Sequence, residues 1–240
     1  MAIYIAVCDD NIADRKQTER LLEREKDERL KNDGDVLYIE SFGSSTALMT
    51  TPVKYDLFLI DITIGEENGM EIAKKLRNMG IIAPIVLLTS AIKYKSYGNN
   101  PPDIIHINKP IIKGQIAHLI DVAKDWSLNK PRLLEIRGKK ETVFLPHKDL
   151  VRAADKGNCV EVFTSDGRYI EVASTMKMFM ETVNGYSCFT FCKNDIINIH
   201  HVKSINQNSL LLDNGEQFEF SPFKIRQLLE DFVKYTAAHN

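Results

Sequence analysis

The feature that most constrains the fold is a repeated alternation of short apolar runs with helix-forming segments over residues 1–126. Apolar runs of this length are typical of strands that are covered on both faces, and the segments between them have the composition of helices. The expected strands are 3–8, 36–41, 56–61, 85–88 and 104–107, and the expected helices are 12–31, 44–50, 70–78 and 113–126. Asn11 is a candidate N-cap for the first helix, and Gly80 closes the third. This alternation predicts an α/β doubly wound parallel sheet of five strands with helices on both faces.

The pattern changes after residue 126. Residues 127–132 form an expected linker, and residues 133–240 consist of short β-branched and aromatic runs between turn signals such as Asp166-Gly167. Helices are expected over 174–183 and from Pro222 onward, where Ser221 is the candidate N-cap. One face of the last helix is expected to carry Leu228, Leu229, Phe232 and Val233. The sequence therefore predicts two domains, 1–126 and 133–240, of which the second is mostly β.

Composition argues against several classes of protein. Four cysteines in 240 residues are too few for a disulfide scaffold. No segment approaches the ~18–20 consecutive apolar residues that cross a bilayer, and the start reaches acidic residues without a basic leader. We therefore expect a reduced, cytoplasmic protein with no membrane partner. The net charge of −2 does not by itself indicate a nucleic-acid partner.

Polar residues follow four of the five predicted strands at their carboxyl ends. They are Asp9 and Asp10 after the first strand, Asp61 at the end of the third, Thr89 after the fourth and Lys109 after the fifth. In an open parallel sheet, ligands bind in the crevice beyond these strand ends. Acidic residues also end strands because loops are solvated, but the agreement of four strand ends favours a functional interpretation.

Three carboxylates in one crevice repel each other, so either one of them stays protonated or a cation neutralises them. Oxygen ligands in a small cleft favour a hard cation, most plausibly Mg²⁺. This arrangement suits phosphoryl transfer, with Asp61 as the nucleophile that becomes an acyl phosphate. Lys109 would supply an ammonium, and Thr89 a hydroxyl donor, to the phosphoryl oxygens.

These residues carry a family resemblance. The stretches Val7-Cys8-Asp9-Asp10, Leu59-Ile60-Asp61, Leu87-Leu88-Thr89-Ser90-Ala91 and Asn108-Lys109-Pro110, with the interval from Asp61 to Gly69, resemble the receiver domain of two-component response regulators over residues 1–125. The resemblance implies the flavodoxin-like strand order 2-1-3-4-5. It further implies a Mg²⁺ site formed by Asp9, Asp10, Asp61 and the carbonyl of Thr63, and a cis bond between Lys109 and Pro110.

The same resemblance implies how the protein would work. A sensor histidine kinase would donate a phosphoryl group to Asp61, and Thr89 and Lys109 would move toward it. The change would favour a homodimer. The protein would then be no enzyme beyond its own phosphorylation and slow dephosphorylation.

Two positions depart from the receiver pattern. His106 stands where receivers usually carry tyrosine or phenylalanine as a switch residue, and its charge state would matter near neutral pH. A histidine exposed on an edge strand is the plainer interpretation. Residues 96–102 are rich in glycine, asparagine and proline, so the fourth helix is expected to be short or irregular.

The second half resembles LytTR-type DNA-binding domains over residues 133–238. The resemblance rests on the apolar frame of residues 189–198, on Asn198, on Leu150 after Asp149, and on Ser221 at the last helix. Thr190 and Cys192 stand where the signature usually has arginine and histidine. The resemblance implies binding to promoter DNA, with contacts from Lys193, Asn194, Cys192, Lys156, Asn158 and Lys224. Lysines would mainly contact phosphate, and asparagine can pair with adenine.

Three alternatives remain at this stage. The C-terminal half could be a protein-interaction module that does not bind DNA. A phosphatase-like hydrolase could use Asp61, but it would want a second aspartate where Thr63 stands. Cys188, Cys192, His200 and His201 could bind zinc, but an extended 188–192 segment would span about 13 Å, which favours a packed or free thiol.

Overall fold

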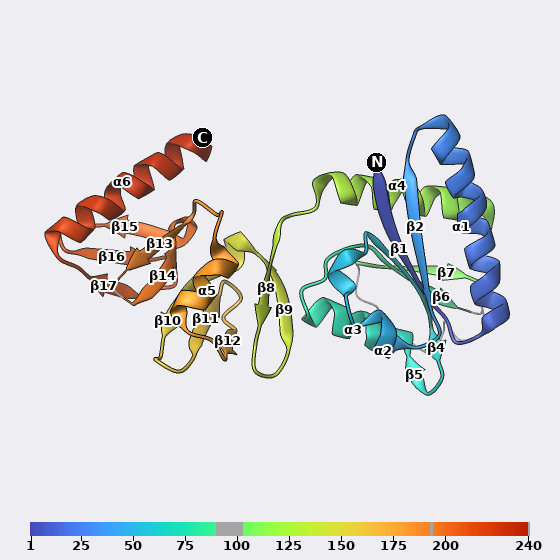
Figure 1. The fold of residues 1–240 in the computed structure, drawn as a ribbon, viewed down its shortest axis with the longest axis horizontal. Coiled ribbons are helices and arrows are strands. Elements are labelled where there is room, and N and C mark those ends of the chain that lie inside the picture. The colour runs from blue at the N-terminus through green and yellow to red at the C-terminus, as the bar shows by residue number, and fades with distance from the viewer. Residues whose placement is uncertain (90–102, 193, 240) are drawn as a thin grey trace. The chain divides into compact units, whose positions relative to one another are not determined.

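The chain folds into two compact units, Met1–Lys130 and Pro131–Asn240 (Figure 1). The structure is a computed structural model that describes residues 1–89, 103–192 and 194–239, with only the backbone of Cys192, Pro222, Thr236, Ala238 and His239. The expected short or irregular helix over residues 96–102 lies outside these residues. Among the described residues, no helix combines the length and apolar character needed to cross a membrane.

The N-terminal unit is a five-stranded parallel sheet with helices between its strands. Its elements are β1 (Ala2–Cys8), α1 (Ile12–Asn32), β2 (Val36–Phe42), α2 (Ser45–Leu48), β3 (Leu57–Asp61), β4 (Thr63–Ile64), β5 (Glu67–Asn68), α3 (Gly69–Asn78), β6 (Ile85–Thr89), β7 (Ile104–Asn108) and α4 (Lys113–Asn129). The strand order is β2-β1-β3-β6-β7, and all four pairings are parallel. The predicted doubly wound fold is therefore confirmed.

The two faces of this sheet are buried under different helices. Alternate residues such as Ile5, Val7 and Leu59 pack in one core with Leu22 of α1 and Ile120 of α4. Because side chains alternate along a strand, the intervening residues face the other side, where α2 and α3 lie (Figure 1). Every residue of β3 and β6 is buried, which explains their continuous apolar sequences.

Local signals at the helix ends behave as expected. The Asn11 side chain accepts hydrogen bonds from the backbone N–H groups of Ala13 (2.9 Å) and Asp14 (3.3 Å) at the start of α1. Gly80 follows α3 with φ +83° and donates its N–H to the carbonyl of Arg77. One expectation is wrong by a few residues: α4 continues to Asn129, so residues 127–129 of the predicted linker are helical.

The C-terminal unit is mostly β. Its elements are β8 (Leu133–Arg137), β9 (Thr142–Pro146), β10 (Leu150–Asp155), β11 (Val160–Thr164), β12 (Tyr169–Val172), α5 (Met176–Val183), β13 (Phe189–Cys192), β14 (Asp195–Asn198), β15 (Val202–Ile205), β16 (Ser209–Leu212), β17 (Gln217–Glu219) and α6 (Pro222–His239). An antiparallel sheet has the order β12-β11-β10-β14-β13, and β15-β16-β17 form a smaller sheet. Gly167, in the predicted hairpin turn, and Gly215, in the turn between β16 and β17, adopt positive φ angles.

The buried face of α6 differs from the predicted one. Ile225 and Leu228 are buried against Ile197 and Leu210, but Leu229 and Val233 are 41% and 60% exposed. Tyr235 is also buried, close to Cys188 and Ile199. The prediction followed the apolar residues at 228–233. The residues of α6 that are buried, such as Ile225, Leu228 and Tyr235, are instead those that contact the smaller sheet and the residues around β13 and β14.

Candidate functional site

The polar residues singled out in the N-terminal unit meet at one edge of the parallel sheet. The strand register places Cys8 beside Ile60, Asp61 beside Leu88, and Thr89 beside Asn108. The residues that end or follow β1, β3, β6 and β7 therefore lie at the same edge of the sheet. The backbone N–H of Lys109 donates to the carbonyl of Thr89 (2.8 Å), which joins the last two strand ends directly.

Three carboxylates converge at this edge. Asp9 and Asp61 are 1% and 8% exposed, and Asp10 lies at the surface. One oxygen from each of the three lies within 4.8 Å of the others, so the expected juxtaposition is confirmed. Burial raises the pKa of Asp9 above its usual value, although the hydrogen bond from Lys109 opposes this shift.

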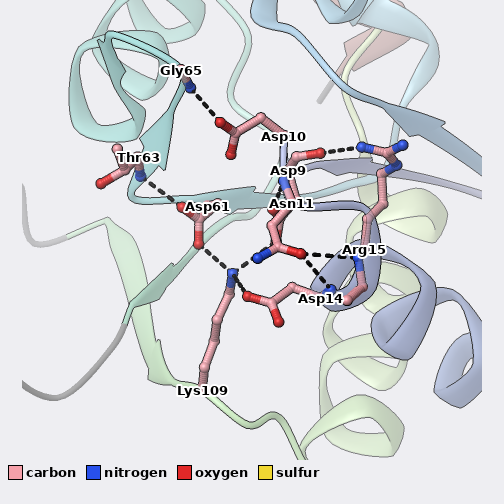
Figure 2. A network of polar contacts seen from close by, with 10 residues as sticks. Asp9, Asp10, Asn11, Asp14, Arg15, Asp61, Thr63, Gly65 and Lys109 are labelled. Atoms are coloured by element: carbon pink, nitrogen blue, oxygen red, sulfur yellow. Dashed lines mark hydrogen bonds and ion pairs between the residues drawn. The ribbon is translucent and has the colours of Figure 1, made fainter.

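Lys109 neutralises part of this charge. Its Nζ lies 2.8 Å from Asp9 Oδ2, 2.5 Å from Asp61 Oδ1 and 3.0 Å from Asp14 Oδ2 (Figure 2). Burial alone would lower the pKa of Lys109, but the hydrogen bonds to Asp61, Asp9 and Asp14 raise it above its usual value. The side chain is therefore a fixed ammonium that touches the Asp61 carboxylate directly.

Backbone N–H groups hold the carboxylates in place. Thr63 donates to Asp61 Oδ2, Gly65 to Asp10 Oδ2 and Asn11 to Asp9 Oδ1, each at 2.8 Å (Figure 2). The β4–β5 hairpin, which the sequence did not predict, supplies the first two of these donors. Because each carboxylate has one oxygen bound this way, its orientation is set before any ligand arrives.

The donor set fits a hard divalent cation. Asp9, Asp10 and Asp61 offer carboxylate oxygens close to one another, which is the chemistry that Mg²⁺ prefers. One ammonium cannot neutralise three ionised carboxylates, so a dication would remove the remaining repulsion. The backbone of Thr63 lies beside Asp61, within the same loop.

Asp14 belongs to this site although the sequence analysis did not single it out. It lies in the first turn of α1, and its carboxylate bonds the Lys109 ammonium. Its place in the first turn of the helix that follows Asp9 and Asp10 is a signal that could have placed it at this sheet edge, although it does not indicate the contact with Lys109.

The predicted switch residue His106 lies on β7, the last strand of the sheet order. Its side chain is half-buried, which differs from the plain expectation of an exposed edge-strand histidine. Burial lowers the pKa of His106, which favours the neutral imidazole near neutral pH.

The predicted DNA-contacting residues of the C-terminal unit divide into three groups. Lys156 and Asn158 lie exposed in the turn between β10 and β11, and Asn194 lies exposed in the turn between β13 and β14. Lys224 is half-buried on α6, where it donates to Gln227. Lys193 and the side chain of Cys192 lie outside the described residues.

Two residues of the signature segment have structural roles. Thr190, which replaces the usual arginine, is 8% exposed, and its hydroxyl donates to Asp231 of α6 (3.3 Å). Asn198 is fully buried, and its side-chain N–H groups donate to the carbonyls of Leu150 (2.7 Å) and His147 (3.0 Å). Its Oδ1 accepts from the N–H of His200 (3.1 Å).

Replacing Asn198 with alanine is expected to destabilise the C-terminal unit by about 1–3 kcal/mol, because buried carbonyl and N–H groups would lose their partners. Hydrogen–deuterium exchange in β10 and β14 would measure the loss. Asn194→Ala, at an exposed turn four residues away, is the matched control and should leave exchange unchanged. Equal protection in the two variants would contradict a structural role for Asn198.

Comparison with known proteins identifies similar domains and similar chains. Residues 140–232 match the family model of the LytTr DNA-binding domain. The chain is 23% identical to the sensory transduction protein LytR of Streptococcus mutans, with 93% of this chain and 97% of the relative aligned. It is 21% identical to the sensory transduction protein LytT of Bacillus subtilis, with 94% and 97% aligned.

Solved structures of both kinds of domain are also similar. A response regulator receiver domain from Methylobacillus flagellatus is 16% identical, with a TM-score of 0.42, and the match covers 51% of this chain and 99% of that one. A LytTr DNA-binding domain from Bacillus cereus is 17% identical, with a TM-score of 0.35, and the match covers 42% and 95%.

The N-terminal unit has a receiver-like fold, a doubly wound parallel sheet with an acidic cluster at its strand ends. The family match defines the C-terminal segment as a LytTR domain. The chain therefore combines a receiver-like fold with a segment that matches the LytTR domain, and it is similar over most of its length to LytR and LytT proteins.

Proposed function

We propose that this chain is a phosphorylation-controlled transcription regulator. A sensor histidine kinase donates a phosphoryl group to Asp61, and the phosphorylated protein binds promoter DNA through its LytTR domain. The observation that carries the proposal is the contact of the Lys109 ammonium with Asp61, inside a cluster of three carboxylates at the sheet edge.

The proposed chemistry follows from this geometry. A carboxylate oxygen of Asp61 forms a bond to phosphorus while the bond from phosphorus to the donor's leaving atom breaks, so Asp61 becomes an acyl phosphate. Lys109 offsets the negative charge on the transferring oxygens, and Thr89 supplies a hydroxyl donor. Asp9, Asp10, Asp61 and the Thr63 carbonyl would hold Mg²⁺, which adds further charge compensation when bound.

The output step is a shift between two receiver states. The phosphoryl group draws Thr89 and Lys109 inward, and His106 on the neighbouring edge strand follows as the switch residue. The altered receiver favours a homodimer, so two LytTR domains engage adjacent half-sites with a high effective concentration. The protein would act in the cytoplasm, where a kinase output domain and promoter DNA are both accessible.

A hydrolase is the weaker candidate. Thr63 stands where a phosphatase of this type would need its acidic residue, and its backbone N–H is bound to Asp61. A threonine hydroxyl cannot act as a general acid near neutral pH, so turnover of phosphomonoesters is not expected.

The proposal is tested by DNA binding with and without phosphorylation. Fluorescence anisotropy on DNA upstream of the protein's own and neighbouring genes, with a small phosphodonor and Mg²⁺, should show binding tightened by about 10²-fold or more. Binding should weaken steeply as salt rises, because phosphate contacts release counterions. A protein that is fully phosphorylated but binds none of these DNAs would favour the interaction-module alternative.

Individual contacts can be tested in the same assay. Lys156→Ala is expected to weaken binding to all DNA sequences and to reduce the salt slope by about one, as for loss of one phosphate contact. Lys177→Ala, which removes an exposed lysine at the start of α5, is the matched control. If the two variants bind alike, Lys156 is not a DNA contact.

A further inference from the structure

A second group of metal-ligating side chains lies in the C-terminal unit. His147 comes from the short 3-10 helix His147–Asp149, Cys188 directly precedes β13, and His200 lies in the 3-10 helix Ile199–His201. One ligand atom from each of the three lies within 4.8 Å of the other two. Cys188 is buried and His200 is exposed, so the group reaches from the core to solvent.

The backbones of these three residues are tied to one another independently of any ligand. The fully buried side chain of Asn198 donates to the carbonyl of His147 (3.0 Å) and accepts from the N–H of His200 (3.1 Å). The N–H of Ile199 donates to the carbonyl of Cys188 (2.7 Å). Residues 198–200 therefore hold the backbones of all three residues close to one another.

We propose that His147, Cys188 and His200 form a zinc site. One thiolate and two imidazoles are typical ligands of Zn²⁺, whereas Mg²⁺ prefers oxygen ligands such as those of the receiver. Zinc bonds of about 2.0–2.3 Å would space the ligand atoms roughly 3.5 Å apart, so small side-chain rotations would complete the site. On binding, the thiol releases its proton to solvent and the sulfur donates an electron pair to the ion.

The surroundings suit a metal-binding histidine. The hydroxyl of Tyr235 on α6 lies within hydrogen-bond distance of both ring nitrogens of His200, the longer contact being 3.4 Å to Nδ1, and the two ring centroids lie 4.9 Å apart. A histidine that binds metal through one nitrogen usually bonds a polar group through the other, which fixes the ring. Three protein ligands leave a fourth position for water or a small anion, because His200 faces solvent.

The ligand set differs from the zinc alternative that the sequence raised. Cys188 and His200 belonged to that set, but His201 instead contacts Asp213 Oδ2 and the carbonyl of Lys148, each at 2.7 Å. His147 was not considered, since it lies 41 residues before Cys188 in the sequence. Only the fold brings the three side chains together.

Titration of the full chain with Co²⁺ in excess Mg²⁺ tests the proposal, because Mg²⁺ occupies the receiver's carboxylates and does not compete for a thiolate. The wild type should develop a thiolate-to-cobalt charge-transfer absorption that saturates at one ion per chain. Added Zn²⁺ should remove this absorption by displacement.

Variants separate this site from adventitious binding. Cys188→Ser and His200→Ala should each abolish the absorption. Cys159→Ser and His201→Ala, which alter another buried cysteine of the C-terminal unit and the histidine adjacent to His200, should retain it. His200 is exposed, so His200→Ala should keep the fold even if Cys188→Ser does not. The proposal is overturned if the wild type shows no such absorption, or if His200→Ala keeps it with unchanged affinity.

Discussion

Asp61→Asn should eliminate labelling of the chain by a small phosphodonor in the presence of Mg²⁺. The amide of asparagine has no ionised oxygen, so it cannot form the bond to phosphorus that a carboxylate forms. Intact-mass spectrometry should show one added phosphoryl group on the wild type and none on the variant. The fold should survive, because Lys109 keeps its contacts with Asp9 and Asp14.

A matched control tests whether labelling requires Asp61 or occurs at any exposed carboxylate of the N-terminal unit. Asp27→Asn removes an exposed carboxylate on α1, and it should be labelled like the wild type. Labelling of the Asp61 variant at the wild-type level would place the phosphoryl group elsewhere and would remove the basis of the proposed function.

Asp61→Asn also separates the two domains functionally. The variant should retain the weak DNA binding of the unphosphorylated protein and should lose the response to phosphodonor, because the LytTR domain is unchanged. If phosphodonor still strengthens DNA binding, the receiver does not control the output through Asp61.

The parallel sheet and its acidic edge could be predicted because both depend on local sequence. Runs such as 57–61 and 85–89 are buried throughout, and a strand buried on both faces must be apolar along its whole length. The polar residues then mark the strand ends, and parallel strands bring those ends to one edge. Asp9, Asp61 and Lys109 therefore meet as expected.

Features that depend on contacts between distant segments were missed. The contact of Asp14 with Lys109 joins residues 95 positions apart, and the sequence gives no register for such a pair. The face of α6 that is buried depends on the sheets beneath it, so Leu229 and Val233 were misplaced although the helix itself was predicted. His147 was missed as a candidate ligand for the same reason.

The close approach of α3 to the end of β3 leads to the second large prediction. Gly69 donates its N–H to the carbonyl of Ile62 (2.9 Å) at the start of α3. A Cβ added at Gly69 would lie 2.1 Å from the backbone oxygen of Asp61 and 3.1 Å from Cα of Ile62. These are backbone atoms at the end of the strand that carries Asp61, so no side-chain rotation can relieve the overlap.

Gly69→Ala is therefore expected to destabilise the receiver by about 1–3 kcal/mol and to slow phosphorylation, because the strand end that orients Asp61 must move. Urea unfolding followed by Trp126 fluorescence reports on this unit alone, since Trp126 is the only tryptophan of the chain and lies on α4.

Gly114→Ala is the matched control: a Cβ there meets nothing within 4 Å, and the position lies in the first turn of α4. The same substitution should be neutral at Gly114 or stabilise by up to about 1 kcal/mol. Unfolding midpoints and labelling rates that match between the Gly69 variant and the wild type would show that the strand end tolerates displacement, and that close packing against α3 does not position Asp61.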